Sequence, residues 1–265
     1  MARGMGDDPG YLRTHQYADS GNLQARIALH RRFSTSEVPF HRWLFDRLLE
    51  EGPVLRVVEA GCGPATLWTA NADRVPAGWS LALTDLSPGM VDEAREALET
   101  AGQAAAFAVA DAATLPFPDA SADLLIANGM LYHVPDRRRA LAEFRRVLRP
   151  GGALHAWTVG EAHLQELDEL GRRHLRSLPG NVSAAARFGL ENGREQLAPF
   201  FADVRLDRFP DGLRVTEVEP LVAHIRSRTG LDEPGLDAVA AEAAAVIARD
   251  GAFVVTKSSG VFICH

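Results

Sequence analysis

Short apolar runs alternate with amphipathic stretches along most of the chain, beginning near residue 54. Each apolar run has the length of a buried β-strand and is bounded by polar or turn-forming residues. The runs that predict strands are Val54–Val58, Ser80–Thr84, Ala104–Val109, Asp123–Asn128, Ala153–Thr158, Val204–Phe209 and Phe253–Cys264. Because strands that alternate with helices form parallel sheets covered on both faces, the pattern predicts an α/β fold with a mostly parallel seven-stranded sheet.

Helical stretches fill the intervals between strands and extend the fold at both ends. Ser87-Pro88, for example, suits the N-cap and first residue of a helix. We interpret residues 1–50 as an N-terminal helical lid segment, because their helical stretches precede the sheet. Residues 51–265 would form the main domain, with substrate-covering helices at about 161–200 and 216–250. The latter helices form an insertion between the last two strands.

Charge and cysteine content narrow the classes of partner. The 265 residues include 28 basic and 35 acidic side chains, a net charge of −7, which argues against a nucleic-acid-binding domain. No secretion signal is visible, and no run approaches the roughly 20 apolar residues that span a bilayer. Cys62 and Cys264 cannot form a disulfide framework, and no side chains show metal-ligand spacing. We therefore expect a cytoplasmic protein with neither nucleic-acid nor membrane partners and no metal.

A glycine-containing turn follows the first predicted strand. The segment Glu59-Ala60-Gly61-Cys62-Gly63 lies where a strand ends and a helix begins. Glycines allow a sharp turn there and let a ligand approach the backbone, while the free amides of the next helix face that ligand. Tight turns also use glycine for structural reasons alone, so the segment needs support from a second feature.

Acidic residues at the ends of the next two strands supply that support. Asp85 ends the second strand, at a distance from the turn close to the roughly 20 residues that separate a glycine turn from a ribose-binding acid. Asp111 ends the third strand. Each acid alone would also suit a helix N-cap. Together with the turn, they lie at the carboxyl ends of adjacent strands, where open α/β sheets hold ligands.

The order and spacing of these segments resemble the class I S-adenosylmethionine-dependent methyltransferases, a family with a Rossmann-like fold. The resemblance is to the small-molecule branch that includes the ubiquinone and menaquinone methyltransferases, and it covers residues 54 to 159. Pro116-Phe117-Pro118-Asp119 and Arg146-Val147-Leu148-Arg149-Pro150-Gly151-Gly152 also match family motifs. The resemblance implies S-adenosylmethionine as cofactor and methyl transfer to a small molecule, with secondary metabolism as one setting.

The resemblance also implies roles for single residues. Gly61 and Gly63 would lie against the amino-acid part of the cofactor, and Asn128 would reach its amino group. Asp85 would hold the ribose hydroxyls. One departure is Ala65, where the family usually has a third glycine; its methyl group is expected to narrow the pocket slightly.

The adenine would be held by residues after the second and third strands. Leu86 and Met90 would contact the ring, although both also suit the apolar core, and we favour Leu86. Asp111 and the amide of Ala112 would bind the edge of the adenine. The expected cofactor-binding residues are therefore Glu59, Gly61, Cys62, Gly63, Asp85, Leu86, Met90, Asp111, Ala112 and Asn128.

Histidines are the candidates for acid–base chemistry. His133 follows the fourth strand and would face the methyl donor, with an ordinary pKa of about 6.5 that suits a general base. A histidine there can equally pack against the cofactor or the loop. His30 and His41, on the front helices, would either close over the pocket or lie at the solvated surface.

Two other functions share part of this pattern. A nicotinamide-dependent oxidoreductase would have the same glycine turn and ribose acid, but Thr66 occupies a position where its fingerprint needs a small residue. Lys257 is also far in sequence from any tyrosine that would complete a proton relay. A non-catalytic nucleoside-binding protein would keep the fold without the chemistry. The methyltransferase remains the favoured interpretation.

Overall fold

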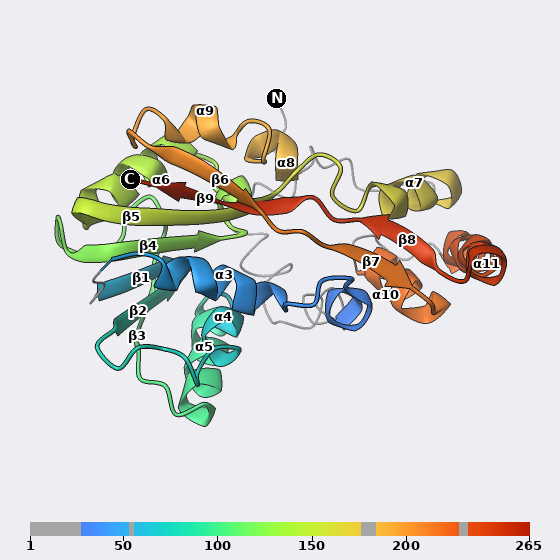
Figure 1. Cartoon of the computed structure of the whole chain (residues 1–265), viewed down its shortest axis with the longest axis horizontal. Helices are drawn as coiled ribbons and strands as arrows, with labels where there is room; N and C mark the ends of the chain where they lie inside the picture. The colour runs from blue at the N-terminus through green and yellow to red at the C-terminus, as the bar shows by residue number, and fades with distance from the viewer. Residues whose placement is uncertain (1–27, 53–55, 176–183, 228–232) are drawn as a thin grey trace.

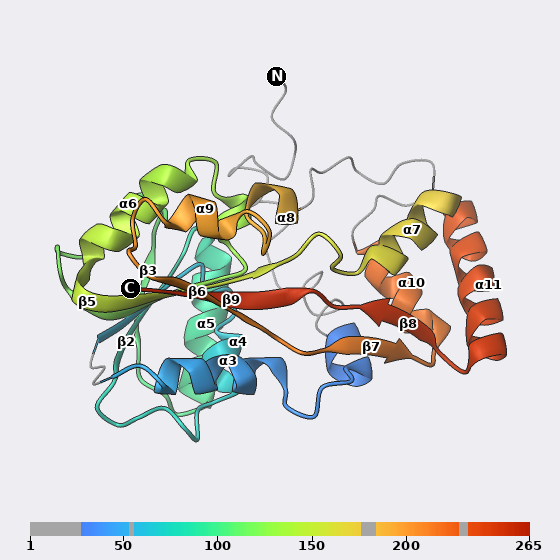
Figure 2. The same ribbon diagram turned by 45° about the horizontal axis from the view of Figure 1, so that its top comes forward.

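The computed structural model describes residues 28–52, 56–175, 184–227 and 233–265, and it has a seven-stranded sheet beside a smaller unit (Figures 1 and 2). The strand order is β3-β2-β1-β4-β5-β9-β6, so the order reverses between β1 and β4. Strands β1 to β5 are parallel, and β9 is antiparallel to both β5 and β6. The predicted α/β fold with a mostly parallel seven-stranded sheet is confirmed.

The strands of this sheet correspond to the predicted apolar runs. Their bounds are β1 Arg56–Ala60, β2 Ser80–Asp85, β3 Ala106–Val109, β4 Ala122–Asn128, β5 Leu148–Val159, β6 Val204–Arg208 and β9 Ser259–Cys264. β5 begins earlier than predicted, because Pro150-Gly151-Gly152 continues as strand after ending the preceding helix. The register of β5 with β4 is irregular there, between Ala122 and Leu124.

Helices cover both faces of the sheet, as Figure 2 shows. One face packs against α3 (Phe40–Leu49), α4 (Thr66–Thr69) and α5 (Pro88–Thr100). The other packs against α6 (Arg137–Val147), α8 (Ala184–Arg187) and α9 (Gly193–Leu197). Successive residues of the central strands point to opposite faces, which gives each face its own apolar core.

A smaller unit, which we call the cap, lies beyond the carboxyl ends of the parallel strands (Figures 1 and 2). It consists of helical residues 28–33 and of α7 (Gln165–His174), β7 (Gly212–Val215), α10 (Val218–Arg226), α11 (Glu233–Asp250) and β8 (Phe253–Thr256). These elements share a third apolar core, to which Leu29, Leu170, Leu221 and Val255 contribute.

The cap differs from the sequence prediction in one respect. Phe253–Cys264 was predicted as one strand, but the structure divides it into β8, which pairs with β7, and β9 in the large sheet. The insertion therefore contains a two-stranded sheet as well as helices. The prediction was wrong because a run of strand-forming residues does not show where the chain changes its pairing partner.

The expected lid and covering helices are distributed over both units. Residues 1–27 of the expected lid lie outside the described residues; residues 28–33 join the cap, and α3 packs against the sheet. Within the stretch 161–200, α7 belongs to the cap, whereas α8 and α9 pack near α6 and β9. No helix in the described part of the chain has the length and apolar character needed to cross a membrane.

Candidate functional site

A cavity of about 1,050 Å³ lies between the carboxyl edge of the sheet and the cap. Every residue that the sequence singled out for cofactor binding or catalysis lines it: Glu59, Gly61, Cys62, Gly63, Asp85, Leu86, Met90, Asp111, Ala112, Asn128 and His133. They come from the ends of β1, β2 and β4 and from the segments that follow β1, β2, β3 and β4. The fold therefore brings together residues that are far apart in the sequence, at the position where strand order reverses.

The glycine turn after β1 leaves the backbone open toward this cavity. Gly61 (φ +71°) and Gly63 (φ +52°) both adopt the left-handed conformation. The amides of Gly61 and Cys62 donate to Thr84 O at 2.8 and 3.0 Å, which ties the turn to the end of β2. A Cβ on Gly61 would lie 2.8 Å from the Cβ of Met130, whereas a Cβ on Gly63 would meet nothing within 4 Å. Gly63 thus marks open space that a ligand can approach.

Ala65 corrects an expectation about this turn. It has φ 55°, a conformation that non-glycine residues rarely adopt, and this explains why glycine suits the position. Its side chain is fully buried within the core on the α3–α5 face and does not line the cavity. The expected narrowing of the pocket by its methyl group was therefore wrong, because the methyl points into the core.

Asp85 joins the turn to the next helix. Its Oδ2 accepts a hydrogen bond from Gly63 N at 2.9 Å, and its Oδ1 accepts one from Ser87 N at 2.9 Å. Burial raises the pKa of Asp85, although these backbone donors oppose the shift. Each carboxylate oxygen retains a second lone-pair direction. The side chain is therefore held rigidly at the cavity wall and can still accept hydrogen bonds from a ligand.

Glu59 and Asn128 form a buried polar group beside the turn. Glu59 accepts from Trp68 Nε1 at 2.6 Å and from Asn128 Nδ2 at 3.1 Å. Burial raises the pKa of Glu59 to about 8. Asn128 Oδ1 is buried and has no hydrogen-bond partner among the described residues. An acceptor oxygen without a donor, next to a carboxyl group, suits a cationic ligand group such as an ammonium.

The other predicted contact residues, Leu86, Met90, Asp111 and Ala112, line the same cavity. Met90 lies in the first turn of α5 and is 2% exposed. Ser87 caps this helix, as predicted. Asp111 Oδ1 accepts from Ala113 N at 2.8 Å, which shapes the loop after β3. Whether these groups contact an adenine ring and its edge stays a prediction of the sequence.

His133 lies in a single 3₁₀ turn, Leu131–His133, that follows β4. Its ring lies edge-on to that of Tyr132, with a centroid separation of 4.6 Å, and both residues line the cavity. The position is compatible with the predicted role in proton transfer and with packing against a ligand.

The rest of the cavity wall includes Phe40, Trp157 and Lys257, which sequence reasoning did not assign. Phe40 and Trp157, with ring centroids 5.0 Å apart, supply an apolar wall. His30 and His41 also line the cavity, and burial is the main reason that the pKa of each falls to about 4. Lys257 is the only lysine in the chain, which was a signal that the sequence offered. No group of three or more metal-ligating side chains occurs within the ranges that the structure describes.

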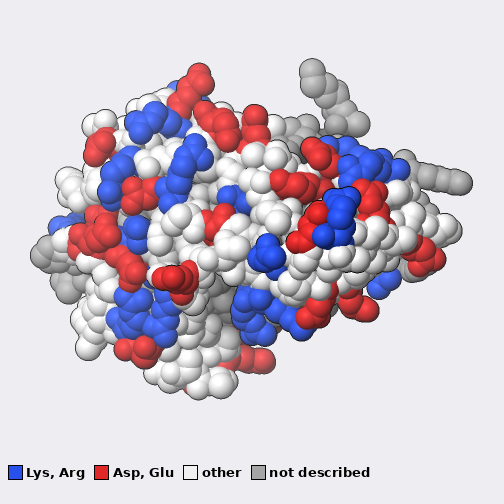
Figure 3. Space-filling model, turned by 45° about the vertical axis from the view of Figure 1, so that its right-hand side comes forward, with Lys and Arg blue, Asp and Glu red and all other residues white. Residues whose placement is uncertain are grey.

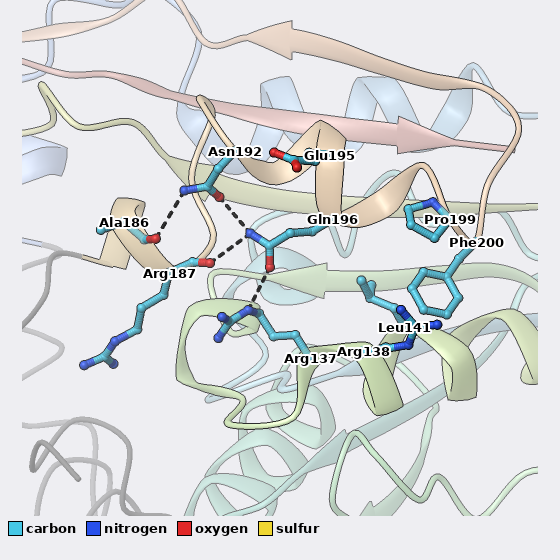
Figure 4. Close-up of a pocket in the computed structure, with 10 residues that line it drawn as sticks. All are labelled: Arg137, Arg138, Leu141, Ala186, Arg187, Asn192, Glu195, Gln196, Pro199 and Phe200. Carbon is cyan, nitrogen blue, oxygen red and sulfur yellow. Dashed lines mark hydrogen bonds between the residues drawn. The ribbon is translucent and has the colours of Figure 1, made fainter. Parts of the chain in front are cut away.

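A second pocket, of about 520 Å³, lies between α6, α8 and α9 (Figure 4). Gln196 is the centre of its hydrogen bonds: Oε1 accepts from Arg137 Nε at 2.9 Å, and Nε2 donates to Arg187 O at 2.9 Å. Nε2 also donates to Asn192 Oδ1 at 2.8 Å. These bonds join the helices to one another, so we assign them a structural role and the chemistry to the larger cavity.

Comparison with known proteins agrees with this geometry. A family model described as a methyltransferase domain matches residues 58–156. A malonyl-[acyl-carrier protein] O-methyltransferase of Erwinia pyrifoliae is 37% identical over 200 residues, covering 72% of this chain and 73% of the relative. A trans-aconitate 2-methyltransferase of Methylobacterium radiotolerans is 33% identical over 219 residues, covering 79% of this chain and 80% of the relative.

Solved structures show the same fold at lower sequence identity. The [4+2]-cyclase SpnF is 20% identical, with a TM-score of 0.61 and coverage of 100% of this chain and 97% of that one. Phosphoethanolamine N-methyltransferase 2 of Haemonchus contortus is 18% identical, with a TM-score of 0.58 and coverage of 97% and 59%. Given the sequence relatives, this chain belongs to the class I S-adenosylmethionine-dependent methyltransferases, in the branch that acts on small molecules.

Proposed function

We propose that this methyltransferase binds S-adenosylmethionine at the sheet side of the cavity and a small organic acceptor at the cap side. The observation that carries the proposal is that one continuous cavity joins the turn after β1 to His30 of the cap, to His41 at the start of α3 and to Lys257, which follows β8. A donor and an acceptor can then lie end to end in one space, which an in-line displacement requires.

The residues present suit the cofactor. Asn128 Oδ1 offers a buried acceptor to its ammonium, Gly63 leaves room for its amino-acid part, and Asp85 presents a fixed carboxylate to its ribose. Leu86 and Met90 would contact the adenine, with Asp111 and Ala112 at its edge. When bound, the sulfonium supplies an activated methyl group to a nucleophile on the far side of the methyl carbon.

The contribution of the chain to the reaction is chiefly alignment. Holding two reactants in register can supply about 7–11 kcal/mol of the barrier. A general base is needed only if the attacking atom carries a proton at neutral pH. His133 is our candidate for the residue that accepts this proton. The cap, with its expected N-terminal lid, would exclude water from the aligned pair.

Several features favour a small-molecule acceptor over nucleic acid. The net charge is −7, and Lys/Arg and Asp/Glu side chains are interspersed on the face shown in Figure 3. The cavity has the size of a site for small ligands, which typically measures about 300–1,000 Å³. The relatives named above make trans-aconitate and malonyl thioesters the first acceptors to test. The test is methyl transfer from radiolabelled S-adenosylmethionine to these and other small molecules; failure to bind the cofactor would overturn the proposal.

The affinity for the cofactor is expected to increase with pH. Because burial raises the pKa of Glu59 to about 8, much of the free enzyme carries a neutral Glu59 at pH 7. A bound cation favours the ionised carboxyl group, so binding releases a proton and strengthens as the pH rises from about 6 to about 7.5, below the ordinary pKa of an α-amino group. Calorimetry in buffers of different ionisation enthalpy measures both effects. Replacement Glu59→Gln should largely remove them; an unchanged pH dependence in this variant would contradict the assignment.

Replacement His133→Ala is expected to slow turnover by about a hundredfold for an acceptor that must lose a proton. Affinity for S-adenosylhomocysteine should stay within about twofold of the wild type, because the base contacts the acceptor. Single-turnover rates with a hydroxyl acceptor and calorimetry with S-adenosylhomocysteine separate the two properties. An unaltered rate would leave His133 as a packing residue.

A further inference from the structure

A buried ion pair lies at the cap side of the cavity. Lys257 Nζ donates to Asp211 Oδ2, and the two side chains are 7% and 0% exposed. Asp211 precedes β7 and Lys257 follows β8, and the pairing of Gly212 with Thr256 holds them opposite each other. Ser259 pairs with the last residue of β5, so Lys257 lies beyond the sheet edge, on the cap side. Both charged residues line the cavity.

Asp211 does not depend on Lys257 for hydrogen bonds. Its Oδ1 accepts from Ser34 Oγ at 2.8 Å and from the amides of Thr35, Ser36 and Gly212 at 3.1, 3.1 and 2.8 Å. These donors stabilise the negative charge of the carboxylate and fix it against the loop of residues 34–36. Within the described ranges, Lys257 is the one hydrogen-bond donor to the other oxygen, Oδ2. One oxygen of Asp211 thus holds the loop in place, and the other oxygen positions the ammonium of Lys257.

The ammonium of Lys257 retains unused hydrogen-bonding capacity. An ammonium carries three N–H donors, and among the described residues that of Lys257 donates to Asp211 only. The same nitrogen also lies 5.4 Å from the centroid of the Phe209 ring. Burial of a charge with free donors is unfavourable unless another group completes the site. The donors lie beside a cavity, so a ligand can provide that group.

His30 is a second incompletely bonded group in this region. It lines the same cavity, and its Nδ1 is buried without a hydrogen-bond partner among the described residues. Burial and the charge of Lys257 lower the pKa of His30 to about 4, so its ring is neutral at pH 7. The phenyl and indole rings of Phe40 and Trp157 provide an apolar wall to the cavity.

We propose that Lys257 is a specificity-determining residue that binds a carboxylate of the methyl acceptor, with His30 as a second polar contact and Phe40 and Trp157 against its apolar body. The substrate class is therefore a small carboxylic acid. This inference rests on the proposed function, because it assigns the acceptor side of the same cavity. A carboxylate fits better than a phosphate dianion, because Asp211, beside the single ammonium, repels a dianion more strongly than a monoanion.

Two matched variants separate recognition from structure. Lys257→Gln removes the positive charge and leaves the hydroxyl and amide donors to Asp211 Oδ1 in place. Asp211→Asn keeps an oxygen for those donors and removes the negative charge beside Lys257. If the ammonium binds a carboxylate, the first variant weakens the binding of acids and the second strengthens it. If the pair only stabilises the fold, neither variant changes the preference between an acid and its amide.

The experiment measures binding of benzoate, trans-cinnamate and 4-hydroxybenzoate, each beside its primary amide, to full-length enzyme saturated with S-adenosylhomocysteine. We expect at least one acid to bind about tenfold or more tightly than its amide. Lys257→Gln should abolish that preference, and Asp211→Asn should increase it. The proposal is overturned if no acid is preferred at millimolar concentration, if the preference survives Lys257→Gln, or if Asp211→Asn fails to increase it.

The affinity for S-adenosylhomocysteine distinguishes this inference from the function on which it rests. We expect wild type, Lys257→Gln and Asp211→Asn to bind it equally. A wild-type enzyme that did not bind it would contradict the proposed function itself. Loss of its binding in Lys257→Gln alone would show that the ammonium holds the carboxylate of the cofactor, and the inference about the acceptor would then be wrong.

Discussion

Replacement Asp85→Ala is expected to weaken binding of S-adenosylmethionine by at least about a hundredfold. Without the carboxylate, the two ribose hydroxyls lose their hydrogen-bond acceptor. Hydrogen bonds to a charged group contribute about 1.5–3 kcal/mol each. The variant also removes the acceptor of Gly63 N and Ser87 N, which loosens the turn that faces the cofactor. Calorimetry on the purified variant, with circular dichroism to verify folding, measures the effect.

The matched control is Asp92→Ala. Asp92 is an exposed acid on α5 whose side chain pairs with Arg95 at 2.8 Å and does not line the cavity. The Asp92→Ala variant removes one carboxyl group, as Asp85→Ala does, so it controls for long-range electrostatics. We expect its cofactor affinity to stay close to that of the wild type. Equal affinities in the two variants would show that Asp85 does not hold the ribose.

Replacement Gly61→Ala is expected to destabilise the protein by about 2–5 kcal/mol. The left-handed conformation costs a side chain about 1–2 kcal/mol, and the overlap with Met130, 2.8 Å from the new Cβ, adds a further cost of about 1–3 kcal/mol. The midpoint of urea unfolding measures the change. Cofactor affinity should fall as well, because Met130 lines the cavity and must shift.

Gly102→Ala isolates the backbone contribution to this effect. Gly102 has φ +69°, close to that of Gly61, and a Cβ there would meet nothing within 4 Å. We expect this variant to lose only about 1–2 kcal/mol and to bind the cofactor normally. If Gly61→Ala were no less stable than Gly102→Ala, the close approach of Met130 to the turn would not be a constraint on this site.

The cofactor side of the cavity could be predicted from sequence because its residues follow strand ends. The ends of β1 and β2 and the loop after β3 carry Gly61, Asp85 and Asp111, and a parallel sheet places such residues along one edge. The local pattern also located the start of α5 at Pro88, since Ser87 supplies the N-cap. These features depend on short segments and on one general rule of sheet topology.

The acceptor side could not be predicted in this way. Asp211 and Lys257 are 46 positions apart, and they meet because β7 pairs with β8 in a separate two-stranded sheet. No apolar periodicity encodes that pairing, and the run Phe253–Cys264 reads as one strand. The side-chain direction of Ala65 depended likewise on a backbone conformation that residue type alone does not reveal.

A crystal structure of the enzyme with S-adenosylhomocysteine tests the central claim most directly. The account predicts that the Asp85 carboxylate accepts hydrogen bonds from both ribose hydroxyls and that Asn128 Oδ1 accepts one from the ammonium. The cap side of the cavity, near Lys257, should remain accessible to an acceptor. An adenosyl group bound elsewhere, or a ribose without contact to Asp85, would contradict the account.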